Sequence, residues 1–107
     1  MAREKLQTLT EQMFYALLCF YEECCGTDVM KKTNEITKGR VRIGSGTLYN
    51  LIEQFTNEDI IRETKVDGRK KSYILTEKGR NILANDCRRL QQQIEDFNMY
   101  SRSDRRL

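Results

Sequence analysis

The segment Ile43–Phe55, with the sequence IGSGTLYNLIEQF, combines an apolar helical face with a polar face that suits hydrogen bonding. Its apolar residues recur at i, i+3, i+4 and i+7 from Leu48 to Phe55, which predicts a helix with one buried face. The opposite face contains neither Lys nor Arg and presents Gly46, Tyr49, Asn50 and Glu53. An asparagine amide has the geometry to bind adenine, a tyrosine can reach a phosphate, and a glutamate can accept a hydrogen bond from cytosine. This face therefore suits recognition of a nucleic acid.

The residues at the start of this helix favour contact with phosphates. Gly44 and Gly46 allow the backbone to turn and to approach a phosphate closely, and Ser45 is the predicted N-cap residue. Ser45 and Thr47 add hydroxyl groups, while the helix N-terminus adds free N–H groups and the positive end of the helix dipole. We therefore expect the N-terminal half of this helix to face the nucleic acid.

Two basic clusters flank the polar helix. The first consists of Lys38, Arg40 and Arg42. The second, Arg62–Lys71, has a net charge of +3, and the cations at its end are Arg69, Lys70 and Lys71. Cations that hold phosphates, beside neutral groups that face the bases, are typical of sequence-specific DNA binding. Either cluster alone could be a solvated loop, but the two together favour contact with DNA.

The composition excludes the commoner enzyme and metal sites. The 107 residues carry a net charge of +3 and include no histidine, so the commonest general base near pH 7 is missing. The four cysteines form no C-x-x-C pair, and no nucleotide-binding or hydrolase glycine motif occurs, so we expect no catalytic residues, no metal and no cofactor. Cys19, Cys24 and Cys25 fit best as small buried hydrophobic residues. Because the chain has no apolar run of about 20 residues, a cytoplasmic location is predicted.

Two further helices are predicted before the polar helix. A capping box at Thr8–Glu11 starts the first, whose apolar residues repeat with helical period to about Cys25. Gly26 is the expected stop, and one of the next two residues is expected to cap a second helix that ends near Gly39. The polar helix itself is predicted at Gly46–Glu58. Two helices with a short glycine-containing connection, and a third helix before them, form a helix-turn-helix pattern.

The next region has the two-residue period of β-strands. The predicted strands are Ile60–Val66 and Arg69–Leu75. Asp67 and Gly68 lie between them, and Asp-Gly between β-compatible runs indicates a hairpin with a two-residue turn. In this register Ile61 lies opposite Ile74, so the inner end of the hairpin is apolar and its tip is basic.

A long helix is predicted at the C-terminal end. Thr76 is expected to cap it, and it runs from Glu77 to about Tyr100, roughly 36 Å at ~1.5 Å per residue. Its apolar residues are spaced alternately by four and three, the pattern of a coiled-coil interface. These residues are Leu83, Cys87, Leu90, Ile94 and Phe97. The stripe could pack on the core of its own chain, but the helix is too long for a winged core of about 70 residues, so a second copy is the expected partner.

Together these elements predict a mainly α fold with a small β-hairpin, in the α+β class. Residues 1–76 form a winged helix-turn-helix DNA-binding domain, residues 77–100 form a dimerisation helix, and residues 101–107 form a basic tail. The second helix of such a pair enters the major groove of DNA, and Ile43–Phe55 occupies that position.

Three segments of the sequence resemble the PadR family of bacterial transcriptional regulators. They are LTEQMFYALLCFYEE, GRVRIGSGTLYNLIEQF and DGRKKSYILTEKGR, in which G-T-L-Y and Y-x-L-T-x-x-G are the selective motifs. The resemblance covers Leu9 to about Arg80 and implies a homodimeric repressor on a palindromic operator, with the C-terminal helix as the dimer interface. It also assigns DNA contacts to Ser45, Gly46, Thr47, Tyr49 and Asn50 in the helix, and to Arg69, Lys70 and Lys71 in the wing.

A single C-terminal helix is similar to the short subgroup of this family, some members of which bind flat aromatic molecules between tryptophans at the dimer interface. This chain has no Trp, so Phe97 and Tyr100 are the candidates for stacking on an aromatic effector that releases the repressor from DNA. Where many relatives have glycine after the recognition helix, this chain has Asp59. The alternative function is a winged-helix protein-interaction module, in which Tyr49 and the wing meet another protein rather than DNA.

Overall fold

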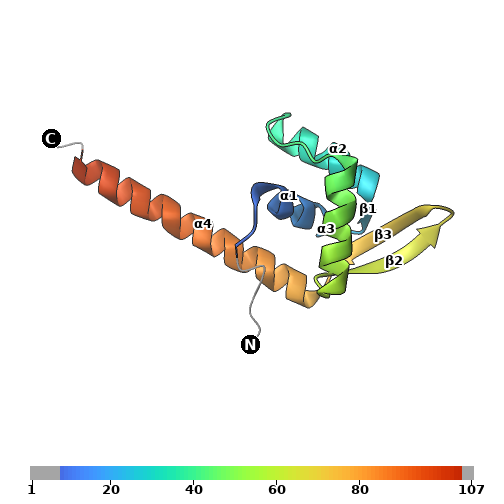
Figure 1. Cartoon of the computed structure of the whole chain (residues 1–107). Helices are drawn as coiled ribbons and strands as arrows, with labels where there is room; N and C mark the ends of the chain where they lie inside the picture. Colours follow the sequence, from blue (N-terminus) through green and yellow to red (C-terminus); the bar gives the residue numbers. More distant parts are fainter. Residues whose placement is uncertain (1–7, 105–107) are drawn as a thin grey trace.

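The computed structural model describes the backbone of residues 8–104 and the side chains of residues 8–102 (Figure 1). Its elements, in chain order, are α1 (Glu11–Cys19), β1 (Cys24–Cys25), α2 (Gly26–Thr37), α3 (Ser45–Asn57), β2 (Ile61–Asp67), β3 (Lys70–Leu75) and α4 (Glu77–Asp104). Within residues 8–104, four helices and a three-stranded antiparallel sheet confirm the predicted α+β class. The end of the predicted basic tail, residues 105–107, lies outside the described residues.

The first helix, α1, starts two residues later than predicted. Thr10 rather than Thr8 is its N-cap, and the Thr10 hydroxyl accepts a hydrogen bond from the N–H of Met13 at 3.1 Å. The helix ends at Cys19 rather than near Cys25, because the chain leaves the helix here to join the sheet.

The short strand β1 is an element that the sequence analysis did not predict. Cys24 pairs with Tyr73 and Cys25 pairs with Ser72, so that β1 lies beside β3 in a sheet with the order β1-β3-β2. The apolar run up to Cys25 suggests a helix when only local spacing is considered. Pairing with a strand distant in sequence overrides that local preference.

The second helix, α2, begins at Gly26, the residue that was expected to be a helix stop. Cys25 is its N-cap, so the predicted caps Thr27 and Asp28 are wrong. Asp28 nevertheless stabilises this end of the helix, since its carboxylate accepts a hydrogen bond from the N–H of Cys25 at 3.3 Å. At the other end, Lys38 takes a left-handed conformation with φ of 54°.

The third helix, α3, starts at Ser45, and Gly44 rather than Ser45 is its N-cap. The Gly44 backbone is extended, and its carbonyl accepts a hydrogen bond from the N–H of Leu48 at 2.9 Å. Because a glycine has no side chain, it cannot cap the first N–H groups of the helix, and those groups stay available to a ligand. The helix ends at Asn57, close to its predicted end.

The hairpin of β2 and β3 turns one residue later than predicted. Its turn consists of Gly68 and Arg69, not of Asp67 and Gly68. Gly68 has φ of 65°, and glycine readily adopts a positive φ at the first central position of a two-residue turn.

The hairpin register also differs from the prediction. Ile61 lies opposite Leu75 rather than Ile74. The displaced turn, together with an irregularity at Thr64 that adds one residue to β2, accounts for this difference. Both Ile61 and Leu75 are buried, so the inner end of the hairpin is apolar as predicted.

An apolar core joins α1, α2, α3 and the sheet to the first turns of α4. The predicted apolar face of α3 is buried, and its residues are Leu48, Leu51, Ile52 and Phe55. The Phe20 ring packs edge to face on Tyr73, with the ring centroids 5.9 Å apart. This core fixes α3 and the hairpin relative to each other.

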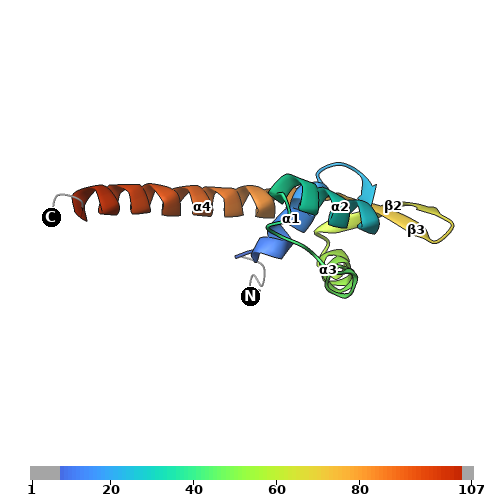
Figure 2. The ribbon, with the colours of Figure 1, turned by 90° about the horizontal axis from the view of Figure 1, so that it is seen from above.

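The last helix, α4, projects far beyond this core (Figures 1 and 2). Thr76 caps it as predicted, because its hydroxyl accepts a hydrogen bond from the N–H of Gly79 at 3.0 Å. The helix has 28 residues and ends at Asp104, past the predicted end at Tyr100, which makes it about 42 Å long. The Cα radius of gyration is 16.3 Å, whereas a compact domain of about 100 residues has roughly 13 Å.

Candidate nucleic-acid interface

The outward face of α3 presents the polar residues that the sequence analysis selected. Ser45, Gly46, Thr47, Tyr49 and Asn50 are all exposed. The Tyr49 side chain is 70% exposed, although it follows directly after the buried Leu48. A large aromatic side chain so open to solvent on a helix whose other face is core is available to a partner.

The wing, formed by β2 and β3, carries the predicted cations at and beside its turn. Arg69, Lys70 and Lys71 are exposed. Lys71 is turned toward Glu63 of the neighbouring strand, with Nζ 4.0 Å from the carboxylate oxygen. Since both side chains are about half exposed, this ion pair is weak and leaves Lys71 able to exchange partners.

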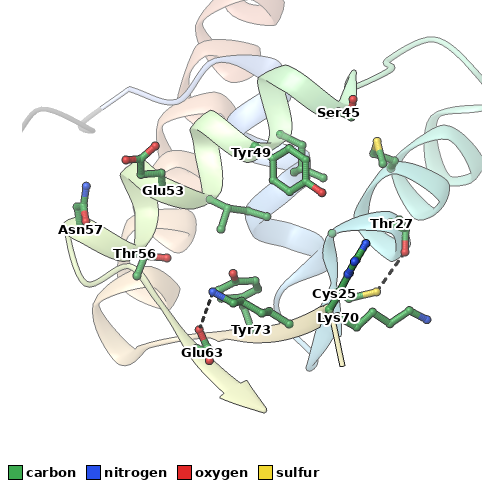
Figure 3. Close-up of a pocket in the computed structure, with 16 residues that line it drawn as sticks. Cys25, Thr27, Ser45, Tyr49, Glu53, Thr56, Asn57, Glu63, Lys70 and Tyr73 are labelled. Carbon is green, nitrogen blue, oxygen red and sulfur yellow. Dashed lines mark hydrogen bonds and ion pairs between the residues drawn. The ribbon is translucent and has the colours of Figure 1, made fainter. Parts of the chain in front are cut away.

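A groove of about 570 Å³ lies between α3, the start of α2 and the wing (Figure 3). Its floor is apolar and includes Met30, Leu48 and Ile52. Of the predicted site residues, the groove brings together Ser45, Tyr49, Arg69, Lys70 and Lys71. In Figure 3, Tyr49 comes from α3, while Lys70 and Tyr73 come from the strand across the groove.

The other predicted residues of α3 lie beside the groove rather than along it. Gly46 and Asn50 lie on the face of α3 opposite its buried residues, because each residue advances by about 100° around the helix axis. Neither lines the groove, although Asn50 directly follows the groove residue Tyr49. Thr47 does not line the groove, because its place two residues after Ser45 turns it by about 200° around the helix axis. The polar surface of α3 is therefore wider than the groove.

The basic connection before α3 is anchored on α1. The Arg40 guanidinium donates hydrogen bonds to the Tyr15 hydroxyl at 3.1 Å and to the Thr37 carbonyl at 3.4 Å. The Arg42 carbonyl accepts a hydrogen bond from the Gln12 amide at 2.9 Å. Arg40 thus supports the connection itself, while Lys38 and the Arg42 side chain are exposed beside it.

Several groove residues were not selected as site residues from the sequence. They are Cys25, Gly26, Thr27, Met30, Leu48, Ile52, Glu53, Thr56, Asn57, Glu63 and Tyr73. The α2 residues reach the groove because β1 pairs with β3, and no local sequence pattern signals that pairing. The sequence did point to two of these residues. Glu53 was identified on the polar face of the helix, and Tyr73 belongs to the Y-x-L-T-x-x-G motif.

The ionisable groups around the groove respond to their surroundings. Hydrogen bonds from the Cys25 thiol and N–H lower the pKa of the Asp28 carboxyl. Partial burial, followed by the nearby Glu63 carboxylate, raises the pKa of the Tyr73 hydroxyl. At neutral pH, the Asp28 carboxyl in the first turn of α2 is therefore ionised. The Tyr73 hydroxyl stays protonated and is able to donate a hydrogen bond.

Three of the four cysteines are placed for packing rather than for redox chemistry. Cys19, Cys24 and Cys25 are buried, as predicted, and burial raises the pKa of the Cys24 thiol to about 11. Such a thiol is protonated and weakly nucleophilic at neutral pH. Among the described side chains, those of residues 8–102, no three His, Cys, Asp or Glu residues gather in a way that could hold a metal ion. No helix within residues 8–104 is long and apolar enough to cross a membrane.

The predicted interface stripe of α4 divides into a buried and an exposed part. Leu83 is only 4% exposed and belongs to the core of its own chain, so we leave it out of the proposed interface. The remaining residues are exposed: Cys87, Leu90 (39%), Ile94 (60%) and Phe97 (68%). We call these four residues the α4 stripe.

Comparison with solved structures shows the same winged architecture in other proteins. A transcriptional regulator from Clostridium thermocellum has 16% sequence identity and a TM-score of 0.71, with 84% of this chain and 91% of that chain covered. A PadR-like transcription factor from Bacteroides fragilis has 25% identity and a TM-score of 0.67, covering 83% and 87%. PadR from Bacillus subtilis, solved in complex with operator DNA, has 22% identity and a TM-score of 0.58, covering 69% and 45%.

Comparison with sequence families gives a match over most of the fold. The model of the transcriptional regulator PadR-like family matches residues 16–85. A search of curated protein sequences found no match. The matched residues run from the middle of α1, through α3 and the wing, into α4. The chain therefore belongs to the PadR-like family, whose members are transcriptional regulators rather than enzymes.

Proposed function

We propose that this regulator binds DNA sequence-specifically as a homodimer and acts as a repressor on a palindromic operator. The observation that carries the proposal is the groove in which Ser45 and Tyr49 of α3 face the wing cations. The solved complex of the similar Bacillus subtilis PadR with operator DNA supports this use of the fold.

In the proposed complex, α3 enters the major groove and the groove beside it receives the phosphate backbone. A major groove about 12 Å wide admits an α-helix, and the outermost residues Gly46 and Asn50 then lie nearest the base edges. Asn50 reads adenine with its side-chain amide. Because Gly46 has no side chain, the helix backbone is able to approach the DNA closely there. Thr47 contacts the DNA from outside the groove.

Phosphates of the strand beside α3 are held from both walls of the groove. Ser45 and the first N–H groups of α3 bind from one wall, because Gly44 leaves those N–H groups without a side-chain cap. Arg69, Lys70 and Lys71 bind from the wing. Lys38 and Arg42 add contacts before the helix, and Arg40 contributes mainly by holding the connection on α1.

The proposed dimer forms through the α4 stripe. Leu90, Ile94 and Phe97 continue the helix face that Leu83 uses inside the core, but they are exposed. The C-terminal part of α4 projects beyond the winged domain (Figure 1). Exposed apolar side chains repeated at heptad spacing are suited to pairing with an identical helix. Two copies related in this way place two recognition helices on the two halves of a palindrome.

We extend the proposal to release from DNA by a small aromatic effector. Phe97 and Tyr100 are both exposed and lie three residues apart, so they share one region of the α4 surface. In the dimer, this region borders the interface, where a flat molecule could stack between side chains of the two copies. Effector binding there would change how the two α4 helices pack.

The test is selection of binding sites from a pool of random-sequence duplexes, repeated at two salt concentrations. Enrichment of a palindrome with half-sites about one helical turn apart supports the proposal. If about six phosphates are neutralised, affinity should fall roughly 10³-fold between 50 and 200 mM salt. Binding without enrichment, or no binding, would instead favour the winged-helix protein-interaction module, since the exposed Tyr49 also suits a protein partner.

A further inference from the structure

The C-terminal end of α3 is joined directly to the first turn of α4. The N–H of Thr76 donates to the Ile60 carbonyl at 2.9 Å, and the Thr76 hydroxyl lies 2.7 Å from the Asp59 carbonyl. Lys78 Nζ donates to the Glu58 carbonyl at 2.8 Å. Three successive carbonyls after α3 are thus bound by α4 or its cap. We call residues 58–60 and 76–79 the α3–α4 junction.

Gly79 brings the backbone of α4 into contact with the same segment. A Cβ atom at this position would lie 2.2 Å from the Ile60 carbonyl oxygen and 3.0 Å from Cδ2 of Leu75. Since real Cβ atoms do not approach a backbone oxygen so closely, any other residue would force α4 away from the exit of α3. Glycine is required here by the close packing of the two segments rather than by a special φ.

The exit from α3 has a defined shape of its own. The N–H of Ile60 donates to the Phe55 carbonyl at 2.8 Å, and the N–H of Asp59 donates to the Thr56 carbonyl at 3.1 Å. Asp59 takes the left-handed conformation, with φ of 64°, that this helix ending needs. Asp59 thus keeps the conformation for which glycine is usual. The α3 end and the α4 start therefore form one connected unit at the base of the wing, next to the paired residues Ile61 and Leu75.

We propose that the α3–α4 junction sets the angle between the recognition helix and the dimerisation helix, and so the half-site spacing that the dimer accepts. Thr76, Lys78 and Gly79 are then positioning residues for DNA recognition. This inference rests on the proposed function, because spacing has meaning only for a dimer on two half-sites.

The length of α4 makes the junction angle important. The middle of the α4 stripe is about 15 residues from the junction, roughly 23 Å along the helix. A change in tilt of about 10° moves a point at that distance by about 4 Å, close to the ~3.4 Å step of one base pair. Small movements at the junction are therefore large enough to change the preferred spacing.

The test measures binding to duplexes in which the spacing between two selected half-sites is changed by one or two base pairs. Lys78→Met removes the contact with the Glu58 carbonyl, and Thr76→Val removes the hydroxyl contacts. Thr76→Ser keeps the hydroxyl, and Arg88→Met removes one charge from an exposed part of α4 outside the junction. Fluorescence anisotropy at fixed salt gives the affinity of each protein for each duplex.

The wild-type chain and the two control variants should lose at least about tenfold in affinity when the spacing is wrong, within the usual range of coupling between sites. Lys78→Met and Thr76→Val should lose less than about threefold, because a looser junction allows α3 to follow the altered half-site. If Thr76→Val does not fold, Lys78→Met alone decides the test. Lys78 is exposed, so its replacement should not disturb the core.

Two results would overturn the inference in different ways. If both junction variants bind every duplex more weakly than the wild-type chain by the same factor, their dependence on spacing is unchanged. The junction then only stabilises the fold, and the proposed function remains. If the wild-type chain shows no dependence on spacing, a dimer does not read two half-sites, and the proposed function fails together with the role of the junction.

Discussion

The apolar stripes of α3 and α4 have similar sequence patterns but opposite environments. Leu48, Leu51, Ile52 and Phe55 of α3 are buried in the domain core. The α4 stripe has the same kind of spacing, yet its Phe97 is 68% exposed whereas Phe55 is 0% exposed. Helical periodicity thus identifies the face that packs, but the length and direction of the helix decide what is available to pack against it. The α4 stripe extends beyond the domain and stays exposed in the single chain.

Replacing one phenylalanine in each stripe should separate the two environments most strongly. Phe55→Ala leaves a cavity in the core and should lower the free energy of unfolding by about 3–5 kcal/mol. Phe97→Ala should change it by no more than about 0.5 kcal/mol in a chain made monomeric by Leu90→Lys, because exposed sites contribute little. Urea unfolding followed by circular dichroism measures both. Similar losses for the two variants would mean that the α4 stripe packs on its own domain.

Placing a charge in the α4 stripe tests its assignment as an interface. Leu90→Lys should give a folded monomer in sedimentation velocity, because the new ammonium group would be buried in the dimer. Affinity for a duplex with two half-sites should fall by about 10²-fold or more, since the two copies no longer bind together. Gln92→Lys adds the same charge on another face of α4 and should remain dimeric. A Leu90→Lys protein that still sediments as a dimer would place the interface elsewhere.

On α3, the outermost polar position tests base recognition. Asn50→Ala should relax the preference at one base position by about 1–3 kcal/mol, because a bidentate amide contact to adenine is lost. Selection with the variant, compared with the wild-type profile, measures the change. An unaltered profile would remove Asn50 from base recognition and leave the α3 surface with a positioning role.

Removing one cation from the wing should have the smallest effect on DNA affinity. It should change the salt dependence of binding rather than the base preference. Lys70→Gln should weaken binding to all sequences by a similar factor and reduce the slope of log affinity against log salt by about one, as expected for one phosphate contact. Arg88→Gln, which removes a charge from the exposed surface of α4, should leave the slope as it is. A variant that changes base preference instead would mean that Lys70 reads sequence.

The sequence was sufficient where local patterns decide the structure. The periodicity of α3, the hydroxyl of Thr76 at the start of α4 and the basic wing are all local features, and their predictions are confirmed. In contrast, β1 depends on Cys24 pairing with Tyr73, far along the chain. Because β1 brings the start of α2 to the wing, the sequence predicted the α3 side and the wing side of the groove but missed the side formed by α2.

Errors of position or role arose where the sequence alone allowed more than one choice. Thr8 and Thr10 are both suitable caps, and the choice depends on where α1 packs. At the hairpin, the Asp-Gly pair predicted the presence of the turn, but its exact position follows from the pairing of β2 with β3. For Leu83, heptad spacing alone cannot distinguish the core of the same chain from an interface with a second copy.

The most direct measurement is a titration of the selected duplex with protein, followed by fluorescence anisotropy over a series of salt concentrations. The account predicts saturation at two chains per duplex and a slope of log affinity against log salt near −5, for about six neutralised phosphates. Saturation at one chain per duplex, or a slope near zero, would contradict the claim that a dimer of this protein holds DNA between α3 and the wing.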